Sequence, residues 1–378
     1  MTASPALRRV ARGDLCAGCG ACAALAPGAV RMAEKDGFPR PAVVGPVPEA
    51  AEAAIARVCP GLDMHLEAGG RPDHVLWGPM LRVAEGHATD EGLRHEASSG
   101  GALSAILVHL LESGAVDGVL QTAADPADPV ANRTVISRSP ADVRAAAGSR
   151  YAPSSPLAGI AAVLEGEARL AFVGKPCDVA ALRAMARDDP RVDARLPWKL
   201  SFFCAGVPSR AGAREVVEAL GLAPDEVAAF RYRGHGWPGR ATARLPDGAE
   251  RSMSYAESWG AILSRHVQFR CKICPDGTGS FADIVCADAW ECDSAGYPVF
   301  DERPGVSLVI ARTKAGERLL AEAETAGSLS LAPFDPERIA AIQPGQVWRK
   351  RVGVARLAAM ALFARPMPRF RGFNLLRA

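Results

Sequence analysis

One stretch of the chain carries a clear helical pattern of apolar residues. Residues 97–114, with the sequence ASSGGALSAILVHLLESG, place apolar side chains three and four positions apart, which is the spacing of a single helical face. Gly114 is suited to end such a helix, because glycine readily adopts the backbone geometry that follows a helix C-terminus. The pattern therefore predicts an amphipathic helix. The residues of its apolar face are Leu103, Ile106, Leu107, Leu110 and Leu111.

Short apolar strands alternate with helices through the middle of the chain. The segment VDGVLQTA is a predicted strand, and ARLAFVG is a second strand that leads into the predicted helix DVAALRAMAR. The strand WKLSFFC and the helix REVVEALG follow. Strand–loop–helix repeats of this kind predict a mostly open α/β sheet.

After residue 225 the pattern changes to shorter strands. EVAAFRYRG and GRATARLPDGAERSMSY are predicted antiparallel strands, with Asp247-Gly248 as a hairpin turn. ADIVCADAW and GVSLVIART are apolar strands, and KAGERLLAEAETAG is an amphipathic helix. From about Asp335 the chain is predicted to be helical and basic, with the run Arg349-Lys350-Arg351.

The composition describes an ordinary soluble protein with an unusual cysteine content. The 378 residues are 49% hydrophobic and 23% charged, and the net charge of +2 gives no general attraction to nucleic acid. No apolar signal segment opens the chain, and the longest apolar stretch, 101–111, is too short to span a bilayer. We therefore expect a cytoplasmic protein. Its ten cysteines would then stay reduced, so they call for a metal explanation before a disulfide one.

The first group of cysteines has the spacing of an iron–sulfur ligand loop. Cys16, Cys19 and Cys22 form a C-x2-C-x2-C run, and Cys59-Pro60 follows at a distance. Three thiolates at this spacing fit one face of a 4Fe–4S cube, and a fourth from elsewhere completes it. Structural zinc is the alternative, but it normally takes two ligands from each loop. The spacing predicts a cluster, with Gly18 and Gly20 letting the backbone approach the sulfurs.

A second group of cysteines lies at the ends of predicted strands. Cys177 follows one strand, Cys204 ends the next, and Cys271 and Cys274 form a separate C-x2-C. The carboxyl ends of strands in an open α/β sheet face one crevice, where these thiols could bind a second cluster. The alternative is that Cys177 and Cys204 are small buried residues. Cys286 and Cys292 are predicted to be structural.

Candidate flavin residues precede and follow the first long helix. Ser98-Ser99-Gly100-Gly101 opens this helix, and such a start can receive a diphosphate, although capped helices are common. Arg150 and Tyr151 could supply a cationic clamp and a ring for stacking. The GHGWPG segment, residues 234–239, suits either backbone contact with a planar ligand or a plain hairpin turn. His235 has no partner that the sequence identifies, so it is not predicted to be a base.

Taken in order, these motifs resemble one family, the beta subunit of coenzyme F-420 (8-hydroxy-5-deazaflavin) hydrogenases and dehydrogenases. That family includes 7-hydroxymethyl chlorophyll a reductase and the ferredoxin-dependent divinyl chlorophyllide 8-vinyl reductase. The matching segments run from Cys16 to about Trp290. They are CAGCGAC, SSGGALSAIL, GSRYAPSSP, VGKPCDVAALR, FFCAGVPS, YRGHGWPG, ESWG, RCKICPDGTGSFADI and DAW.

The resemblance implies a non-covalent FAD and one or two 4Fe–4S clusters, with two favoured. It implies that Cys16, Cys19, Cys22 and Cys59 bind a ferredoxin-type cluster and that Cys177, Cys204, Cys271 and Cys274 bind a cluster of the catalytic core. It also implies a flavin phosphate loop at Ser98, Ser99, Gly100 and Gly101, with Arg150, Tyr151 and Lys175 nearby. Lys175 departs from the family, in which a small or hydroxylated residue often precedes the Pro-Cys pair.

The predicted fold is α/β with α+β elements and has three parts. Residues 1–75 form a small ferredoxin-like iron–sulfur segment, residues 76–333 a mixed-sheet core that binds FAD and a 4Fe–4S cluster, and residues 334–378 a basic helical tail. The Pro- and Gly-rich runs PAVVGPVPEA and AGGRPDH separate the first two parts.

Three classes of function remain open from the sequence. The first is an oxidoreductase in which electrons pass between ferredoxin or a deazaflavin coenzyme, the clusters, FAD and a small conjugated organic substrate. The second is an electron-transfer subunit that docks to a larger redox complex, with the basic tail as the docking surface or simply a solvated helix. The third is a zinc-stabilised binding module, which the near-neutral charge and the lack of aromatics among the Lys and Arg residues disfavour.

Overall fold

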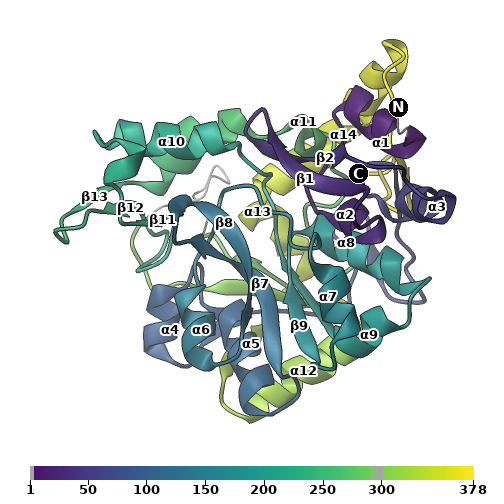
Figure 1. Ribbon diagram of the computed structural model, residues 1–378. Helices are drawn as coiled ribbons and strands as arrows, with labels where there is room; N and C mark the ends of the chain where they lie inside the picture. The colour runs from purple at the N-terminus through teal and green to yellow at the C-terminus, as the bar shows by residue number, and fades with distance from the viewer. Residues whose placement is uncertain (1–3, 292, 294–298, 300) are drawn as a thin grey trace.

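A large mixed sheet organises the computed structural model, which describes residues 4–291, 293, 299 and 301–378 (Figure 1). Its eight strands lie in the order β16-β6-β15-β14-β10-β9-β7-β8. Cys292, predicted to be structural, lies outside the described residues. The strands are β6 (Arg82–Ala88), β7 (Gly118–Asp125), β8 (Asp128–Ser137), β9 (Leu170–Val173), β10 (Trp198–Phe202), β14 (Ile284–Asp288), β15 (Ser307–Ala311) and β16 (Leu329–Pro333).

The direction of the strands determines which loops meet. β14, β10, β9 and β7 are mutually parallel, whereas β15, β6 and β16 on one side and β8 on the other are antiparallel to their neighbours. The predicted mixed α/β sheet is thus confirmed. Because β9 and β10 are parallel neighbours, the turns that carry Cys177 and Cys204 leave the sheet at the same edge.

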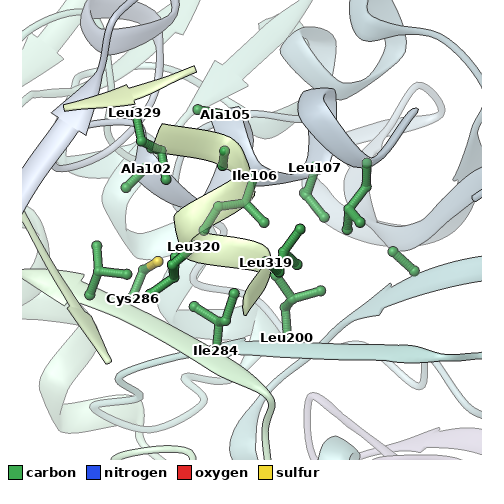
Figure 2. Close-up of a cluster of buried hydrophobic side chains, with 14 of the residues drawn as sticks. Ala102, Ala105, Ile106, Leu107, Leu200, Ile284, Cys286, Leu319, Leu320 and Leu329 are labelled. Atoms are coloured by element: carbon green, nitrogen blue, oxygen red, sulfur yellow. The ribbon is translucent and has the colours of Figure 1, made fainter. Parts of the chain in front are cut away.

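One face of the sheet is covered by the predicted helix α5 (Ala102–Glu112) and by α12 (Lys314–Thr325). Figure 2 shows Ile106 of α5 and Leu320 of α12 above the strand residues Leu200 and Ile284. The sulfur of Cys286 lies among these apolar side chains, and burial raises the pKa of this thiol to about 12. These surroundings agree with the structural role predicted for Cys286.

The opposite face carries α7 (Ile160–Glu165) and α8 (Pro176–Ala186), with α9 (Arg191–Arg195) beside them (Figure 1). Phe172 of β9 is fully buried there against Val179 and Leu182 of α8. This packing fixes the start of α8, and therefore Cys177 in its first turn, relative to the sheet.

The N-terminal segment is more regular than the loop-rich part predicted. It has three helices and a hairpin, and its apolar residues pack with side chains from much later in the chain, including Ile273, Leu357 and Met360. The segment therefore depends on the rest of the chain for its own core. Its elements are α1 (Pro5–Gly13), α2 (Ala21–Leu25), α3 (Glu49–Val58), β1 (Val30–Lys35) and β2 (Phe38–Val43).

A small sheet of three antiparallel strands, predicted from the sequence, lies between the core strands β10 and β14 along the chain. β11 (Ala229–Arg231), β12 (Ala241–Arg244) and β13 (Glu250–Met253) pair antiparallel, and the β12–β13 turn contains Asp247-Gly248. α10 (Arg210–Ala219) packs in the same hydrophobic cluster.

The predicted C-terminal helix is present as α14 (Pro344–Leu362). After it, β17 (Arg369–Arg371) pairs parallel with β3 (Asp63–His65), so the tail returns to the N-terminal segment. Within the described part of the chain, no helix is both long and apolar enough to cross a bilayer. The remaining elements are α4 (Glu91–Glu96), α6 (Pro140–Ala145), α11 (Phe269–Lys272), α13 (Ile339–Ile342), β4 (Asp73–His74), β5 (Gly78–Pro79), a π-helix at Ala256–Ile262 and 3₁₀ turns at Pro224–Glu226, Leu263–His266 and Pro336–Arg338.

Candidate metal centres and flavin loop

The structure brings the first group of cysteines together around one hollow. Cys16 and Cys19 lie in the loop after α1, Cys22 lies in α2, and Cys59 directly follows α3. All of them line the same hollow, whose other walls are mainly apolar residues of α1, α2, α3 and the β1–β2 hairpin. We call these four residues the first cysteine set and their cavity the first hollow.

Glycines let the loop of the first cysteine set fold tightly. Gly18 and Gly20 both have positive φ, at 79° and 88°, a conformation that glycine adopts without strain. The amide of Gly18 donates to Sγ of Cys16 at 3.3 Å. A Cβ on Gly20 would lie 2.6 Å from the backbone nitrogen of Ala158, so a larger residue would push the loop off its support.

The thiols of the first set are close to one another, and Cys19 is buried while the other three are half-buried. Burial raises the pKa of Cys19 and of Cys22, and the nearby Cys59 raises both further. Burial and then Cys16 raise the pKa of Cys59 to about 12. Enclosed thiols whose pKa is raised in this way become thiolates readily only when metal cations neutralise them.

The second group of cysteines also lines a single hollow. Cys177 lies in the first turn of α8, Cys204 follows β10, Cys271 lies in α11, and Cys274 comes just after that helix. Burial, followed by the neighbouring Cys271, raises the pKa of Cys204 to about 12. These residues are the second cysteine set and their cavity the second hollow.

α14 supports the second set from outside the sheet. Gln346 Nε2 and Arg349 Nη1 both donate to the carbonyl of Cys204, each at 3.2 Å, and Arg349 also donates to the carbonyl of Ala205. The Gln268 side chain donates to Sγ of Cys271 at 3.4 Å. The tail therefore helps to shape the site, a role that the sequence did not predict.

The donor set fits iron–sulfur clusters. Every described cysteine is a free thiol. Among the described residues no three His, Cys, Asp or Glu side chains converge on one metal ion. A 4Fe–4S cube binds one thiolate at each of four irons, so its sulfurs stand farther apart than the ligands of a single tetrahedral ion. Four thiols around each hollow suit the cluster.

The partition between the two hollows contains buried charges. Ala17 lines both hollows. Lys175, predicted near the flavin, lies here, with its Nζ 2.8 Å from Oδ2 of Asp178. Arg270 is also buried and donates to the carbonyl of Pro60, beside Cys59, while it lines the second hollow. Sequence reasoning missed Arg270, although its place directly before Cys271 was visible.

In the predicted phosphate loop, the polar groups of Ser99 and Gly100 already form hydrogen bonds within the protein. The Ser99 hydroxyl donates to the carbonyls of Ala287 and Val306, and the Gly100 amide donates to the Ser307 hydroxyl. In contrast, α5 begins at Gly101 without a side-chain cap. Ser98, just before the start of α5, is half-buried, and its hydroxyl accepts a hydrogen bond from the Ser149 hydroxyl. The helix start and Ser98 thus fit a phosphate better than Ser99 or Gly100 does.

Arg150 and Tyr151 have protein partners of their own. The guanidinium of Arg150 donates to the side chain of Asn132 and to three backbone carbonyls, so four of its five N–H donors hold strands together. The half-buried ring of Tyr151 lies 4.8 Å from that of Trp259 and edge-on to Tyr232.

The GHGWPG segment anchors an aromatic stack. The buried Trp237 ring stacks on Trp290 with centroids 4.8 Å apart, and its Nε1 donates to Oδ1 of Asp288 at 3.0 Å. Arg233 makes a two-pronged ion pair with the same carboxylate, at 2.9 and 2.8 Å. The tryptophan of this segment therefore packs inside the protein.

Family comparisons match most of the chain. The N-terminal part of the family described as coenzyme F420 hydrogenase/dehydrogenase, beta subunit, matches residues 83–161, and the C-terminal part matches residues 167–337. The chain belongs to this family. The resemblance inferred from the motifs is thereby confirmed. Within the coenzyme F420 hydrogenase/dehydrogenase beta subunit family, the matched regions hold the second cysteine set and the predicted flavin loop, whereas the first cysteine set precedes them.

Curated relatives of the chain are oxidoreductases. The coenzyme F420 hydrogenase subunit beta of Methanococcus voltae is 27% identical over 68% of this chain and 86% of that protein. The chloroplastic 7-hydroxymethyl chlorophyll a reductase of Oryza sativa is 27% identical over 55% of this chain but only 41% of the relative. The F420-dependent formate dehydrogenase subunit beta of Methanocaldococcus jannaschii is 24% identical over 65% and 60%.

A solved structure shares the fold. A chain of the F420-reducing [NiFe] hydrogenase complex from Methanosarcina barkeri superposes with a TM-score of 0.60 at 19% identity. The match covers 79% of this chain and 98% of that chain. At this identity the likeness shows a shared fold and nothing about the chemistry of the site.

Proposed function

We propose that this chain is an iron–sulfur flavoprotein that transfers electrons between a one-electron carrier and a small conjugated organic substrate. The two hollows carry the proposal, because each is lined by four free cysteines and they share Ala17 as a wall. Clusters held on either side of one residue would exchange electrons without an intermediate carrier. Cys16, Cys19, Cys22 and Cys59 would hold one 4Fe–4S cluster, and Cys177, Cys204, Cys271 and Cys274 the other.

The uncapped start of α5 supports the FAD part of the proposal. Its first amides, with Ser98 before them, form a positive helix end suited to phosphate oxygens. FAD, when bound, accepts electrons as a hydride pair and releases them singly, so it links an organic substrate to the clusters. Of the predicted flavin residues, Ser98 and Gly101 keep this role, while Ser99, Gly100, Arg150 and Lys175 support the protein around them. Tyr151, half-buried, remains a candidate for contact with the ring.

The redox partner is proposed to be ferredoxin or a deazaflavin coenzyme, and the location cytoplasmic. Reduced ferredoxin would pass electrons to the first cysteine set, and the reverse route would begin with a reduced deazaflavin. The relatives, a hydrogenase subunit, a formate dehydrogenase subunit and a 7-hydroxymethyl chlorophyll a reductase, are consistent with either direction.

Anaerobic purification followed by iron, sulfide and flavin analysis tests this function. Two 4Fe–4S clusters require about eight irons per chain, and one requires about four. A visible spectrum with flavin and iron–sulfur absorption is expected. A colourless protein that contains zinc, or no metal, would contradict the proposal.

Replacing Cys19 with serine is expected to remove the first cluster and leave the second. The serine hydroxyl is a poor iron ligand, so iron should fall from about eight to about four per chain. FAD should stay bound and ferredoxin-driven turnover should stop. The iron count and the flavin absorbance measure these effects separately. Loss of FAD together with the iron would instead mean that the first cysteine set supports the whole fold.

A second candidate function is an electron-transfer subunit of a larger redox complex. Residues 338–378 contain nine Arg or Lys residues and no Asp or Glu. At the end of α14, Leu362 and Phe363 are 82% and 75% exposed. Arg9 of α1 donates to the carbonyl of Met367, which brings this basic, apolar surface beside the first cysteine set. Such a surface suits an acidic redox protein.

The native size of the protein distinguishes the two functions. An enzyme that acts alone is expected as a 39.6 kDa chain, or a homo-oligomer of it, that turns over with reduced ferredoxin. A subunit is expected in a larger assembly, from which the double substitution Leu362→Ser and Phe363→Ser releases it. The matched control is Leu376→Ser, which is 91% exposed but lies beyond the helix. Light scattering with mass spectrometry of the subunits gives the answer.

A further inference from the structure

Lys175 and Asp178 form a buried ion pair at the start of α8. The two residues are 8% and 0% exposed. Nζ of Lys175 lies 2.8 Å from Oδ2 of Asp178, and the backbone amide of Lys175 donates to the same oxygen at 3.0 Å. Oδ1 of Asp178 is buried without a hydrogen-bond partner among the described residues.

The pair lies between the two cysteine sets. Cys177, from the second set, stands between Lys175 and Asp178 in the sequence. On the other side, Nζ of Lys175 donates to the Ser154 hydroxyl at 3.1 Å. The next residue, Ser155, donates to the carbonyl of Gly18 in the loop of the first set, at 2.8 Å. Two hydrogen bonds and one peptide link thus connect the ammonium to the first cysteine loop.

Helix capping does not explain the lysine. The Asp178 carboxylate caps α8 by accepting a hydrogen bond from the backbone amide of residue 175. This capping bond does not require a positively charged side chain at position 175. A serine or threonine at position 175 would cap the first turn better than lysine, which lacks an acceptor. Burial of an ammonium and a carboxylate is costly, and apolar residues often replace such pairs without loss of stability. Neither capping nor stability explains this buried ion pair, which suggests that its charges have a function.

We propose that the Lys175–Asp178 pair sets the difference in reduction potential between the two clusters. The inference rests on the proposed function, since it needs both clusters. Reduction of a cluster adds one negative charge, so a nearby fixed cation favours the reduced state and a nearby anion opposes it. Lys175 acts on Cys177 and Cys204 of the second set, whereas Asp178 acts on Cys177 and also on Cys19 of the first.

The arrangement favours one direction of transfer. The ammonium raises the potential of the second cluster alone, whereas the carboxylate lowers the potentials of both clusters, so the difference between them comes from Lys175. With both clusters bound, an electron would pass from the first cluster, which would be oxidised, to the second, which would be reduced. Arg270 and Arg349 also line the second hollow and add positive charge there, partly offset by the carboxylate of Asp276. Arg270 acts on Cys59 of the first set as well, so only Arg349 adds to the asymmetry. The pair would therefore act through its fixed charges on the reduction potentials of the clusters, and it would not contact a substrate.

Redox titration of the anaerobic holoprotein, followed by electron paramagnetic resonance, tests the proposal. The one-cluster Cys19→Ser variant identifies the signal of the second cluster. Lys175→Met is expected to lower the potential of the second cluster by about 59 mV, a tenfold change in its one-electron reduction equilibrium. Lys175→Arg keeps the charge and should keep the potential. Asp178→Asn should raise the potentials of both clusters.

Lys199 provides a matched control. It is also buried, and its Nζ pairs with Asp193 at 2.6 Å, but it stands at the start of β10, away from the cysteines that follow the strand. Lys199→Met should leave both potentials unchanged.

The possible outcomes separate the two proposals. If Lys175→Met and Asp178→Asn both keep eight irons and the potentials of the unaltered protein, the pair is structural only and the inference fails. If Lys175→Met does not fold, the milder variant Asp178→Asn provides the test. Its cluster potentials should rise, and unchanged potentials in a folded Asp178→Asn protein would contradict the inference. If the unaltered protein contains no clusters, it is the proposed function that fails.

Discussion

Replacing Cys274 with serine is expected to abolish electron transfer between the first cysteine set and the flavin. Cys274 lines the second hollow, and its thiol lies 3.4 Å from the carbonyl of Asp276 in a tight turn. Serine fits the turn but binds iron poorly, so the second cluster should be lost and iron should fall to about four per chain. The first cluster should still accept electrons from dithionite, while FAD stays oxidised. Stopped-flow absorbance measures both events.

A conservative control separates this effect from general damage. Cys286→Ser also alters a buried cysteine, but that sulfur lies in the apolar cluster between the sheet and α5, outside both hollows. It should lower stability and leave the iron content at about eight. If Cys274→Ser keeps the full iron content and still reduces FAD, the assignment of the second set is wrong.

Replacing Asp288 with alanine is expected to destabilise the fold by about 3–5 kcal/mol. The change leaves the guanidinium of Arg233, 2% exposed, buried without its carboxylate, and it removes the acceptor of the Trp237 indole. Urea unfolding followed by circular dichroism measures the loss. Asp288→Asn keeps the size and one acceptor, so its cost should be smaller.

The control for this change is an exposed ion pair. Asp188 lies 2.8 Å from Arg57 at the surface, with both side chains more than half exposed. Asp188→Ala should cost about 0–1 kcal/mol, because water screens such pairs. Equal unfolding midpoints for the two alanine variants would show that the Arg233–Asp288 pair has little structural importance.

The cysteine groups could be predicted because local spacing and strand position carry the information. The C-x2-C-x2-C run places three thiols on one loop whatever the rest of the fold is. Cys177 and Cys204 were expected to meet because parallel neighbouring strands end at one edge, and the structure brings them to one hollow. The ligand roles themselves stay predictions.

Other parts of the site depended on partners that are distant in the sequence. Arg150 was expected to clamp a phosphate, but its donors reach carbonyls from β8 and β11, and no local pattern announces such contacts. The position of Lys175 depends on Ser154 and on the loop that carries Gly18. The tail was predicted as a helix, yet its pairing through β17 with β3 joins residues about 300 positions apart.

The packing around the first cysteine set constrains when a metal can be installed. Leu357, Met360 and Met367 belong to the same hydrophobic cluster as Leu7, Val10 and Ile55, and those three side chains line the first hollow. A ribosome makes the cysteine loop hundreds of residues before it makes this cover. The first hollow is therefore fully enclosed only when nearly the whole chain has emerged, and until then the cysteine loop would be open to metal insertion.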